Sequence, residues 1–386
     1  MKTSKMAQSI TPSLTRKLFN MANEIGEDVI NLTLGDPDVL TPIEVREEAC
    51  NAIMSGKTRY SANAGLETLR ESYARFFEKH YNLKINYSKN LIATVGGMEA
   101  LYLSLASIID KGDEIIVLAP YYVNYLQMIT MLGGKAITVD TLNKTDEQIM
   151  IDIKTAVSDK TIGIIVNSPC NPTGSILSSL LIDEIAECAI DNDLIVISDE
   201  VYSSLVYDHN IFDSIITRED MLSRTILIDS CSKRFAMTGW RIGVAVGPEE
   251  IVSCMIKMQE NIVACAPLSS QYGAIKAYTE DFDYSYIKDT YQHRRDIVYN
   301  AINNNPLLFC EKPQATFYCF VNIKNTGLSS EEFAYALLEK YHVAVVPGVS
   351  YGKEYCNYIR IAFTLNDDLL TEAMKRIEKF CEDLKK

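Results

Sequence analysis

Between residues 91 and 246 the chain alternates short apolar runs with polar segments. Seven runs rich in Ile, Val and Leu are bounded by Gly, Pro or polar residues and predict strands at 91–94, 114–118, 135–139, 161–167, 194–198, 225–230 and 242–246. Most of these runs are apolar throughout, which is typical of a sheet buried on both faces. Helical segments lie between several of them, for example 98–109 and 178–191. The pattern therefore predicts an α/β fold with a mostly parallel sheet sandwiched by helices.

The two ends of the chain follow a different pattern. After Pro12-Ser13, residues 14–24 show loose helical periodicity, and residues 31–37 suggest a short strand that ends in a Gly/Pro turn. From residue 290 onward, strands are predicted at 316–323, 343–346 and 358–363, and helices at 331–341 and 367–384. The last helix should bury one face, formed by Leu370, Met374, Ile377, Cys381 and Leu384. This end predicts a smaller α+β domain.

With 386 residues, the chain is longer than one hydrophobic core normally supports. We expect an N-terminal arm and part of a small domain at 1–45, a large domain at 46–285, and the rest of the small domain at 286–386.

The composition of the chain argues against several classes of function. The net charge of −14 argues against nucleic acid or an anionic membrane as the main partner. No apolar run approaches the ~18 residues of a spanning helix, and the N-terminus lacks the apolar core of a signal peptide, so we expect a cytoplasmic protein. The ten cysteines form no C-x-x-C pair, which favours buried reduced thiols, and the four histidines are isolated. We therefore expect no metal site.

Candidate chemistry lies where the predicted strands end, because ligands bind at the carboxyl ends of parallel strands. Gly96 and Gly97 follow the strand at 91–94 and open a helix, which predicts either an anion site or a plain tight turn. Asn171 stands in an Asn-Pro-Thr-Gly turn and can donate from its amide. Asp199 and Glu200 follow a buried strand, so one of them needs a cationic partner unless it caps a helix.

Lys233 lies between an apolar strand and an apolar loop, with Arg234 beside it. Partial burial next to another cation lowers a lysine pKa and makes the amine a nucleophile. Ser230 and Arg241 bracket Lys233 and could hold a phosphate. Arg360 interrupts an apolar strand, so it requires either an internal carboxylate or a ligand.

An amine nucleophile, an acidic partner, a phosphate site and a carboxylate-binding arginine are what a pyridoxal-phosphate site requires. In these features the chain resembles the class I/II aminotransferases, the fold-type-I superfamily of aspartate aminotransferase. The resemblance covers nearly the whole chain and is carried, in the family's order, by Gly35-x-Pro37, Tyr60, Gly96-Gly97, Pro120-Tyr-Tyr122, Asn171-Pro-Thr-Gly, Asp199-Glu-x-Tyr202, Ser230-x-x-Lys233-x7-Arg241 and Arg360. It implies a large domain with a seven-stranded sheet and a small α+β domain built from both chain ends.

The resemblance also implies roles for these residues. Lys233 forms the Schiff base with pyridoxal phosphate and later moves the substrate's α-proton. Asp199 pairs with the pyridine nitrogen, and Tyr202 and Asn171 hydrogen-bond the phenolic oxygen. Tyr122 stacks on the ring.

The remaining implied roles concern the phosphate and the substrate. The phosphate end of the cofactor site comprises Gly96, Gly97, Met98, Ser230 and Arg241. Arg360 takes the substrate α-carboxylate, with Gly35 and Asn171 nearby. Tyr60 reaches the phosphate of the neighbouring subunit, which makes the enzyme a homodimer with shared active sites. The implied reaction moves an amino group from an L-amino acid to a 2-oxo acid.

The same residues permit three other interpretations. Ser230-Cys-Ser-Lys233 and Tyr122-Val-Asn124 match parts of the penicillin-binding pattern, but their order is wrong and no K-T-G follows. A non-catalytic regulatory relative would have lost Lys233. A same-fold pyridoxal-phosphate lyase, decarboxylase or oxidase stays open; the lyases carry a His beside the Asp-Glu motif, where this chain has Val201-Tyr202.

Met98 bears on the substrate. In the aspartate aminotransferases that the chain most resembles, a lysine commonly follows the glycine pair and helps hold the distal carboxylate of acidic substrates. Met98 has no charge, and a thioether suits apolar or aromatic groups. We therefore expect neutral, aromatic or large apolar amino acids to compete well with aspartate. The alternative is that Arg16 or Lys17 replaces the missing lysine.

Overall fold

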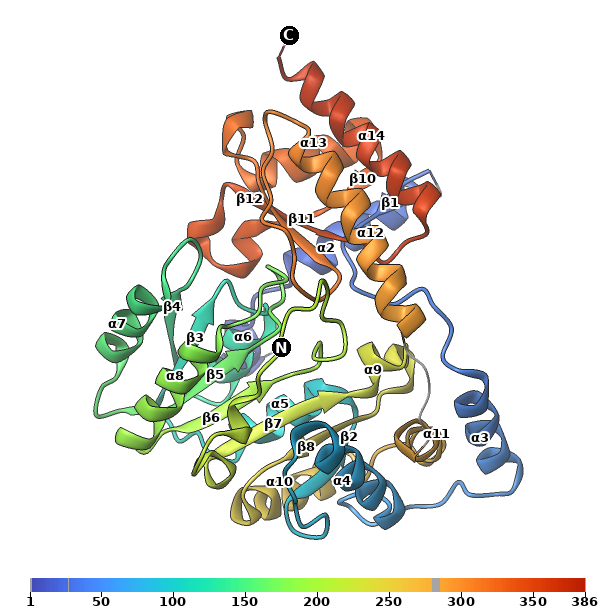
Figure 1. Ribbon diagram of the computed structural model, residues 1–386, viewed down its shortest axis with the longest axis vertical. Helices are drawn as coiled ribbons and strands as arrows, with labels where there is room; N and C mark the ends of the chain where they lie inside the picture. Colours follow the sequence, from blue (N-terminus) through green and yellow to red (C-terminus); the bar gives the residue numbers. More distant parts are fainter. Residues whose placement is uncertain (1, 27, 280–284, 386) are drawn as a thin grey trace.

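Seven strands form one central sheet in the order β2-β8-β7-β6-β5-β3-β4, in the lower half of Figure 1. The computed structural model describes residues 2–26, 28–279 and 285–385. The strands are β2 (Leu91–Thr94), β3 (Glu114–Ala119), β4 (Lys135–Asp140), β5 (Thr161–Asn167), β6 (Ile195–Asp199), β7 (Thr225–Ser230) and β8 (Gly243–Val246). All seven predicted strands are confirmed. Only β8 runs antiparallel to its neighbours β2 and β7 among these strands, so the sheet is mostly parallel, as predicted.

Apolar side chains cover both faces of this sheet, which explains why the strand runs are continuously apolar. In β3, Ile115 and Val117 pack with α5 (Gly96–Ala106), α6 (Asn124–Met131) and α10 (Glu249–Ile262). Ile116 points to the other face and packs with α7 (Asp146–Ala156) and α8 (Ser179–Asp191). Near β2 and β8, that second face is covered by α4 (Glu67–Tyr81) and α11 (Leu268–Thr279), and α3 (Ile43–Met54) packs on α11.

The upper part of the molecule joins both ends of the chain (Figure 1). A three-stranded antiparallel sheet has the order β11 (Val346–Pro347), β12 (Tyr358–Ala362), β9 (Tyr318–Asn322). A separate pair consists of β1 (Ile30–Asn31) and β10 (Val343–Ala344). The helices around them are α2 (Leu14–Ile25), α12 (Ser285–Asn303), α13 (Ser330–Tyr341) and α14 (Asp367–Asp383). The prediction of one strand at 343–346 was wrong, because its two halves pair with different sheets.

Two further expectations are corrected in part. Leu384 is 36% exposed, whereas the other four residues of the predicted apolar face of α14 are buried. Three cysteines, Cys50, Cys254 and Cys356, are exposed rather than buried. The domain boundary expected at 285/286 lies beside residues 280–284, which are outside the described residues, and the division at 45/46 stays a prediction.

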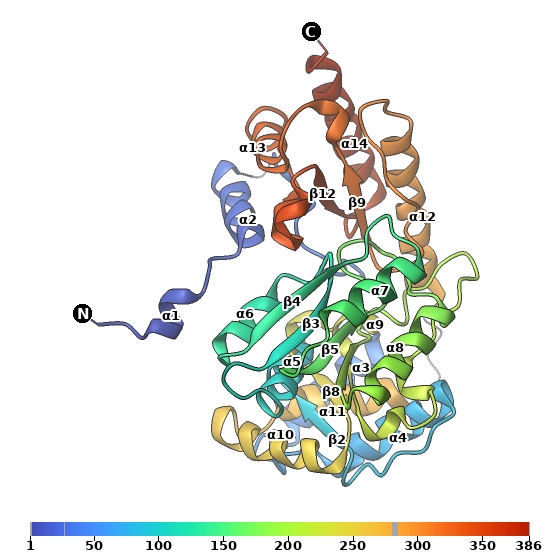
Figure 2. The same cartoon turned by 90° about the vertical axis from the view of Figure 1, so that its left-hand side faces the viewer.

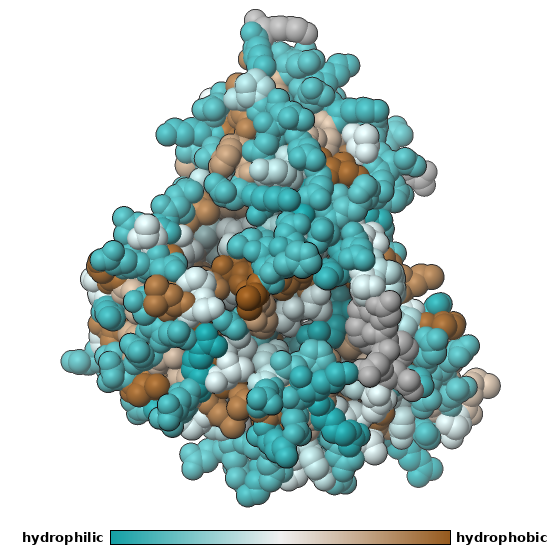
Figure 3. All heavy atoms as spheres, in the orientation of Figure 1, coloured by the Kyte–Doolittle hydropathy of each residue, from teal (hydrophilic) through white to brown (hydrophobic). Residues whose placement is uncertain are grey.

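The N-terminal residues lie apart from the rest of the upper part. Helix α1 (Lys5–Ser9) buries none of its residues and lies beside α6 (Figure 2). Thr11 N–H donates to Gln127 Oε1 at 3.3 Å. The face drawn in Figure 3 is mostly hydrophilic, with hydrophobic residues in small groups. No helix among the described residues combines the length and apolar character needed to span a bilayer.

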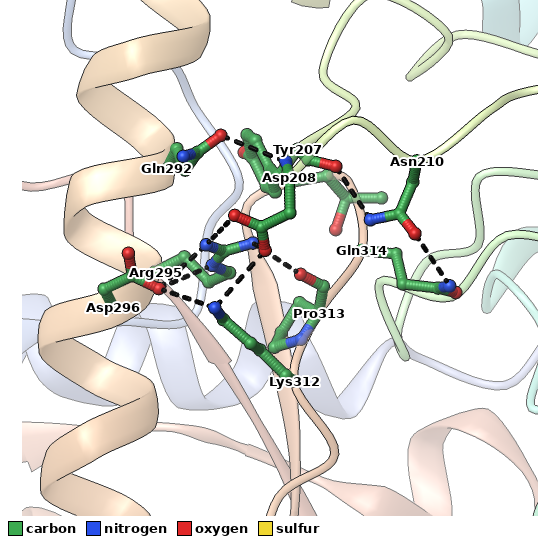
Figure 4. Close-up of polar contacts among 10 residues, drawn as sticks. Tyr207, Asp208, Asn210, Gln292, Arg295, Asp296, Lys312, Pro313 and Gln314 are labelled. Carbon is green, nitrogen blue, oxygen red and sulfur yellow. Dashed lines mark hydrogen bonds and ion pairs between the residues drawn. The ribbon is translucent and has the colours of Figure 1, made fainter.

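An ionic cluster around the buried Arg295 ties α12 to two loops (Figure 4). The Arg295 side chain is fully buried, and Nη1 and Nη2 donate to the two carboxylate oxygens of Asp208 at 2.6 and 3.1 Å. Arg295 also contacts Asp296 at 2.8 Å and donates to Pro313 O at 3.1 Å. Lys312 Nζ lies 3.3 Å from Asp208 and adds a second cation. The cluster holds the 207–210 loop and residues 312–314 against the helix.

Candidate active site

A cavity of about 450 Å³ lies where the central sheet meets the upper part of the molecule. The strands β5, β6 and β7 end at this cavity in Asn167, Asp199 and Ser230. The predicted site residues that line it are Gly35, Gly97, Met98, Tyr122, Asn171, Asp199, Tyr202, Ser230, Lys233, Arg241 and Arg360. Gly96 is not part of the lining but contacts Arg241. Tyr60 lies outside the cavity, with 87% of its surface exposed.

Lys233 lies just after β7, in the short helix α9 (Cys231–Arg234), and its Nζ donates to Gly35 O at 2.7 Å. Burial lowers the pKa of Lys233 to about 8; Asp36 opposes this shift, and Arg360 and Arg241 add to it. The amine is therefore partly neutral near neutral pH. The prediction that Arg234 supplies the neighbouring charge was wrong. Arg234 turns away to Ser203 Oγ, at 2.9 Å, and to buried Asp229, at 3.8 Å.

Asp199 and Glu200 are both buried, and neither has a cationic partner among the described residues, so a cation for either would have to come from a ligand. Tyr125 Oη donates to Asp199 Oδ2 at 2.6 Å, while the buried Oδ1 has no hydrogen-bond partner in the described part of the chain. Burial raises the pKa of Asp199, and the Tyr125 hydrogen bond opposes the rise. Glu200 points away from the cavity lining and accepts from Ser198, Ser214 and Tyr81. Asp199 is thus the carboxylate that keeps one oxygen, Oδ1, without a hydrogen-bond partner among the described residues.

The glycine pair and Arg241 lie together at the N-terminus of α5. Gly96 has φ +74°, and a Cβ there would lie 2.6 Å from Arg241 Nη2, so only glycine allows this approach. A Cβ on Gly243 would lie 2.7 Å from Gly97 N, which keeps β8 tight against the same turn. Ser230 Oγ is buried at the adjacent strand end. Backbone N–H groups, a helix N-terminus and a guanidinium therefore converge, which suits a phosphate.

Arg360 reaches the cavity from β12 in the upper part of the molecule. It is 5% exposed and has no carboxylate partner among the described residues. Nη1 donates to Asn171 Oδ1 at 3.0 Å and Nη2 to Thr33 O at 2.5 Å, and its buried Nε has no partner in the described chain. The Asn171 oxygen is engaged, so its Nδ2 remains to donate into the cavity. A buried arginine with neutral partners is suited to an anionic ligand.

The side of the cavity next to α5 and α6 is less charged. The Met98 sulfur lies 3.4 Å from Tyr122 Oη and 3.5 Å from Asn124 Nδ2. Arg16 lines the cavity and is exposed. Lys17 instead donates to Tyr335 Oη at 3.0 Å and is not part of the lining. Of the two cations considered as replacements for the missing lysine, only Arg16 is therefore in place.

A family model described as aminotransferase class I and II matches residues 27–377. The chain belongs to this family. An aspartate aminotransferase from Pyrococcus abyssi is 38% identical over 380 residues, with 97% of each chain covered. An aromatic-amino-acid aminotransferase from Thermococcus litoralis is 36% identical over 382 residues, with 98% of each covered. The solved aspartate aminotransferase from Thermus thermophilus with maleate has a TM-score of 0.89 at 30% identity, covering 98% of this chain and 99% of that one.

The predicted family, fold and reaction class are thus confirmed. The chain is an aminotransferase, and amino-group transfer is supported over the lyase, decarboxylase or oxidase alternative.

Several residues of the cavity of this aminotransferase were not predicted from the sequence. Tyr125 contacts Asp199, and Tyr318 and Tyr351 line the side formed by the upper part. Tyr125 follows Tyr122 by three residues at the start of α6, and that spacing could have indicated it. Tyr318 and Tyr351 had no comparable signal, because they are tyrosines in otherwise apolar segments of the chain.

Proposed function

We propose that this aminotransferase binds pyridoxal phosphate through Lys233 Nζ and moves the amino group of an L-amino acid to a 2-oxo acid. The observation that carries the proposal is the pairing of two groups in one cavity. One is an amine whose pKa is lowered to about 8, and the other is the buried, unpartnered Oδ1 of Asp199. A cationic ring N–H would give that oxygen the partner it lacks.

The other residues fit the same cofactor. The N-terminus of α5, Ser230 and Arg241 suit the phosphate, and the Tyr122 ring suits a flat aromatic face. Tyr202 Oη and Asn171 Nδ2 are the donors available for the phenolic oxygen. Bound pyridoxal phosphate supplies an electron sink for the electron pair left when a substrate loses its α-proton.

The chain's own groups then have distinct tasks. Arg360 binds the α-carboxylate of the substrate through its guanidinium and so orients the α-carbon. Lys233 Nζ, whose pKa burial lowers to about 8, takes the proton from that carbon. Asp199, held by Tyr125, keeps a proton on the ring nitrogen of the cofactor.

The direct test is a half-reaction. The purified enzyme is loaded with pyridoxal phosphate, amino acids are added, and conversion of the cofactor to its amine form is followed by absorbance. A second measurement is borohydride reduction followed by peptide mapping. We expect a reduced adduct at Lys233, loss of the adduct in Lys233→Ala, and an unchanged adduct in Lys17→Ala. An adduct at another lysine would overturn the assignment.

We also propose a homodimer with shared sites. Tyr60 is 87% exposed and does not line the cavity of its own chain, which supports a role in the site of a second copy. Mixing Tyr60→Phe chains with Lys233→Ala chains should restore activity in hybrid dimers, because one of the two sites then has both residues. Full activity in a demonstrated monomer would contradict this.

For the substrate, we propose that neutral, aromatic or large apolar amino acids compete well with aspartate. Met98, Tyr122, Tyr318 and Tyr351 support this, because they give the cavity an apolar and aromatic lining. Curated relatives include both aspartate and aromatic-amino-acid aminotransferases. The measurement is kcat/KM for aspartate, phenylalanine, tyrosine, methionine and alanine. A hundredfold preference for aspartate, about 2.7 kcal/mol of differential binding, would contradict the proposal.

A further inference from the structure

The Tyr318 hydroxyl lies against the Tyr202 hydroxyl inside the cavity. The two oxygens are 3.0 Å apart, and both side chains are buried. The Tyr318 ring also fills the space beside Gly35, where an added Cβ would lie 1.9 Å from Tyr318 Oη. Tyr318 therefore occupies a fixed position next to the residue assigned to the cofactor's phenolic oxygen, although no motif of the sequence indicated it.

The segment that carries Tyr318 is held on several sides. Thr316 has φ +65°, which is unfavourable for a β-branched residue. Thr316 N–H donates to Leu205 O at 2.9 Å, and Tyr207 Oη donates to Thr316 O. Tyr318 N–H donates to Thr316 Oγ1 at 3.2 Å. These bonds maintain the unfavourable backbone and fix the direction in which the Tyr318 side chain leaves it.

The Arg360 guanidinium lies over the Tyr318 ring, 4.2 Å from its centroid. Burial raises the pKa of Tyr318, and Arg360 opposes that rise. Burial raises the pKa of Tyr202 to well above its ordinary value, with Tyr318 adding to the rise. The 3.0 Å contact allows either hydroxyl to donate, so the direction depends on what else each oxygen binds.

A tyrosine hydroxyl has one proton to donate. If Tyr202 donates it to the phenolic oxygen of the cofactor, its oxygen can only accept from Tyr318. We propose that Tyr318 is a positioning residue that donates to Tyr202 and thereby directs the Tyr202 proton toward the cofactor. The inference rests on the proposed function, since it requires pyridoxal phosphate at Lys233. Hydrogen bonds in series strengthen one another, so losing the first weakens the second.

The test is Tyr318→Phe, which removes the hydroxyl and keeps the ring over which Arg360 lies. The readout is the apparent pKa of the cofactor bound at Lys233, from its pH-dependent visible absorbance. We expect Tyr318→Phe to raise this pKa by about half a unit to one unit. Tyr351→Phe is the matched control, because its ring lies 5.3 Å from Arg360 while the Tyr202 hydroxyl contacts Tyr318. It should leave the pKa unchanged.

A double variant shows whether Tyr318 changes the cofactor pKa through Tyr202 or independently of it. In a Tyr202→Phe background, Tyr318→Phe should produce little further shift, because the residue through which it acts is gone. A full additional shift in that background, or equal shifts in Tyr318→Phe and Tyr351→Phe, would overturn the inference. If the wild-type enzyme formed no reducible adduct at Lys233, the proposed function itself would fail. A normal adduct with an unshifted pKa in Tyr318→Phe would defeat only this inference.

Discussion

Two of the regions that contain buried charges satisfy those charges to different degrees. In the cluster of Figure 4, fully buried Arg295 has two carboxylates and a backbone carbonyl as partners. In the cavity, Arg360 and Asp199 are also buried, yet among the described residues Arg360 has only neutral acceptors and Asp199 only neutral donors, the Tyr125 hydroxyl and the Val201 N–H. Each of the two also keeps one buried polar atom without a partner among the described residues.

The difference indicates what each region is for. A buried ion whose partners are all supplied by the chain holds segments together, and no ligand would improve it. A buried ion that lacks partners raises the free energy of the folded protein until a ligand supplies the missing partner. The charges in the cavity therefore favour ligand binding. The Arg295 cluster is therefore expected to govern folding stability, and the cavity charges are expected to govern catalysis. The following predictions separate the two.

The largest effect should fall on turnover. Asp199→Ala should slow amino-group transfer by about a thousandfold or more, about 4 kcal/mol of activation free energy, because the proton on the cofactor ring loses its support. Asp208→Ala, measured well below its melting temperature, should change turnover by no more than a few-fold. The two are compared by single-turnover absorbance. Near-normal rates in Asp199→Ala would show that its carboxylate has no electrostatic role.

Stability should respond in the opposite way. Asp208→Ala leaves Arg295 buried with Asp296 as its remaining carboxylate partner, and we expect a loss of about 3 kcal/mol in the free energy of unfolding. The control is Glu249→Gln, which breaks the exposed pair with Lys89 and should cost no more than about 1 kcal/mol. Urea unfolding of the holoenzyme measures both. Equal losses in the free energy of unfolding for the two variants would mean that the burial of Arg295 adds nothing to the stabilising effect of its ion pair.

The third prediction concerns Arg16, the exposed cation of the cavity lining, and its binding of a distal substrate carboxylate. Arg16→Gln should lower kcat/KM for aspartate by about tenfold if the guanidinium meets a distal carboxylate, with phenylalanine little affected. Lys17→Gln is the matched control, because Lys17 bonds Tyr335 and does not line the cavity. An equal effect of Arg16→Gln on both donors would exclude a role in selecting acidic substrates.

The smallest effect concerns the charge balance around Lys233. Only the neutral amine attacks a carbonyl, so the rate at which apoenzyme captures pyridoxal phosphate should rise with pH around a midpoint of about 8. Asp36 favours the protonated amine, so Asp36→Asn should lower this midpoint by roughly half a unit. Thr238, whose hydroxyl donates to Asp36, offers the control Thr238→Val, in which the carboxylate stays. A midpoint near that of a free lysine would contradict the lowered pKa.

The central sheet was predictable because its signal is local. Each of the seven strands is a continuous apolar run, and burial on both faces by helices requires that composition wherever the strand lies in the sheet. The short strands of the upper part were less predictable. Whether residues 343–346 form one strand or two depends on which distant segments pair with them, here β1 and β12. Pairing partners far away in sequence leave no local pattern.

The site, like the fold, has features that the sequence predicts and features that depend on distant parts of the chain. The sequence alone determined that Lys233, Asp199 and Asn171 follow buried strands, so the carboxyl edge of the sheet had to gather them. Only the tertiary structure decided which charges surround Lys233. Arg234, its neighbour in sequence, turns to Asp229, while Arg360 comes from a strand more than a hundred residues away. Electrostatic interactions depend on distance in space and on burial, and chain folding sets both, so neighbours in sequence do not reveal them.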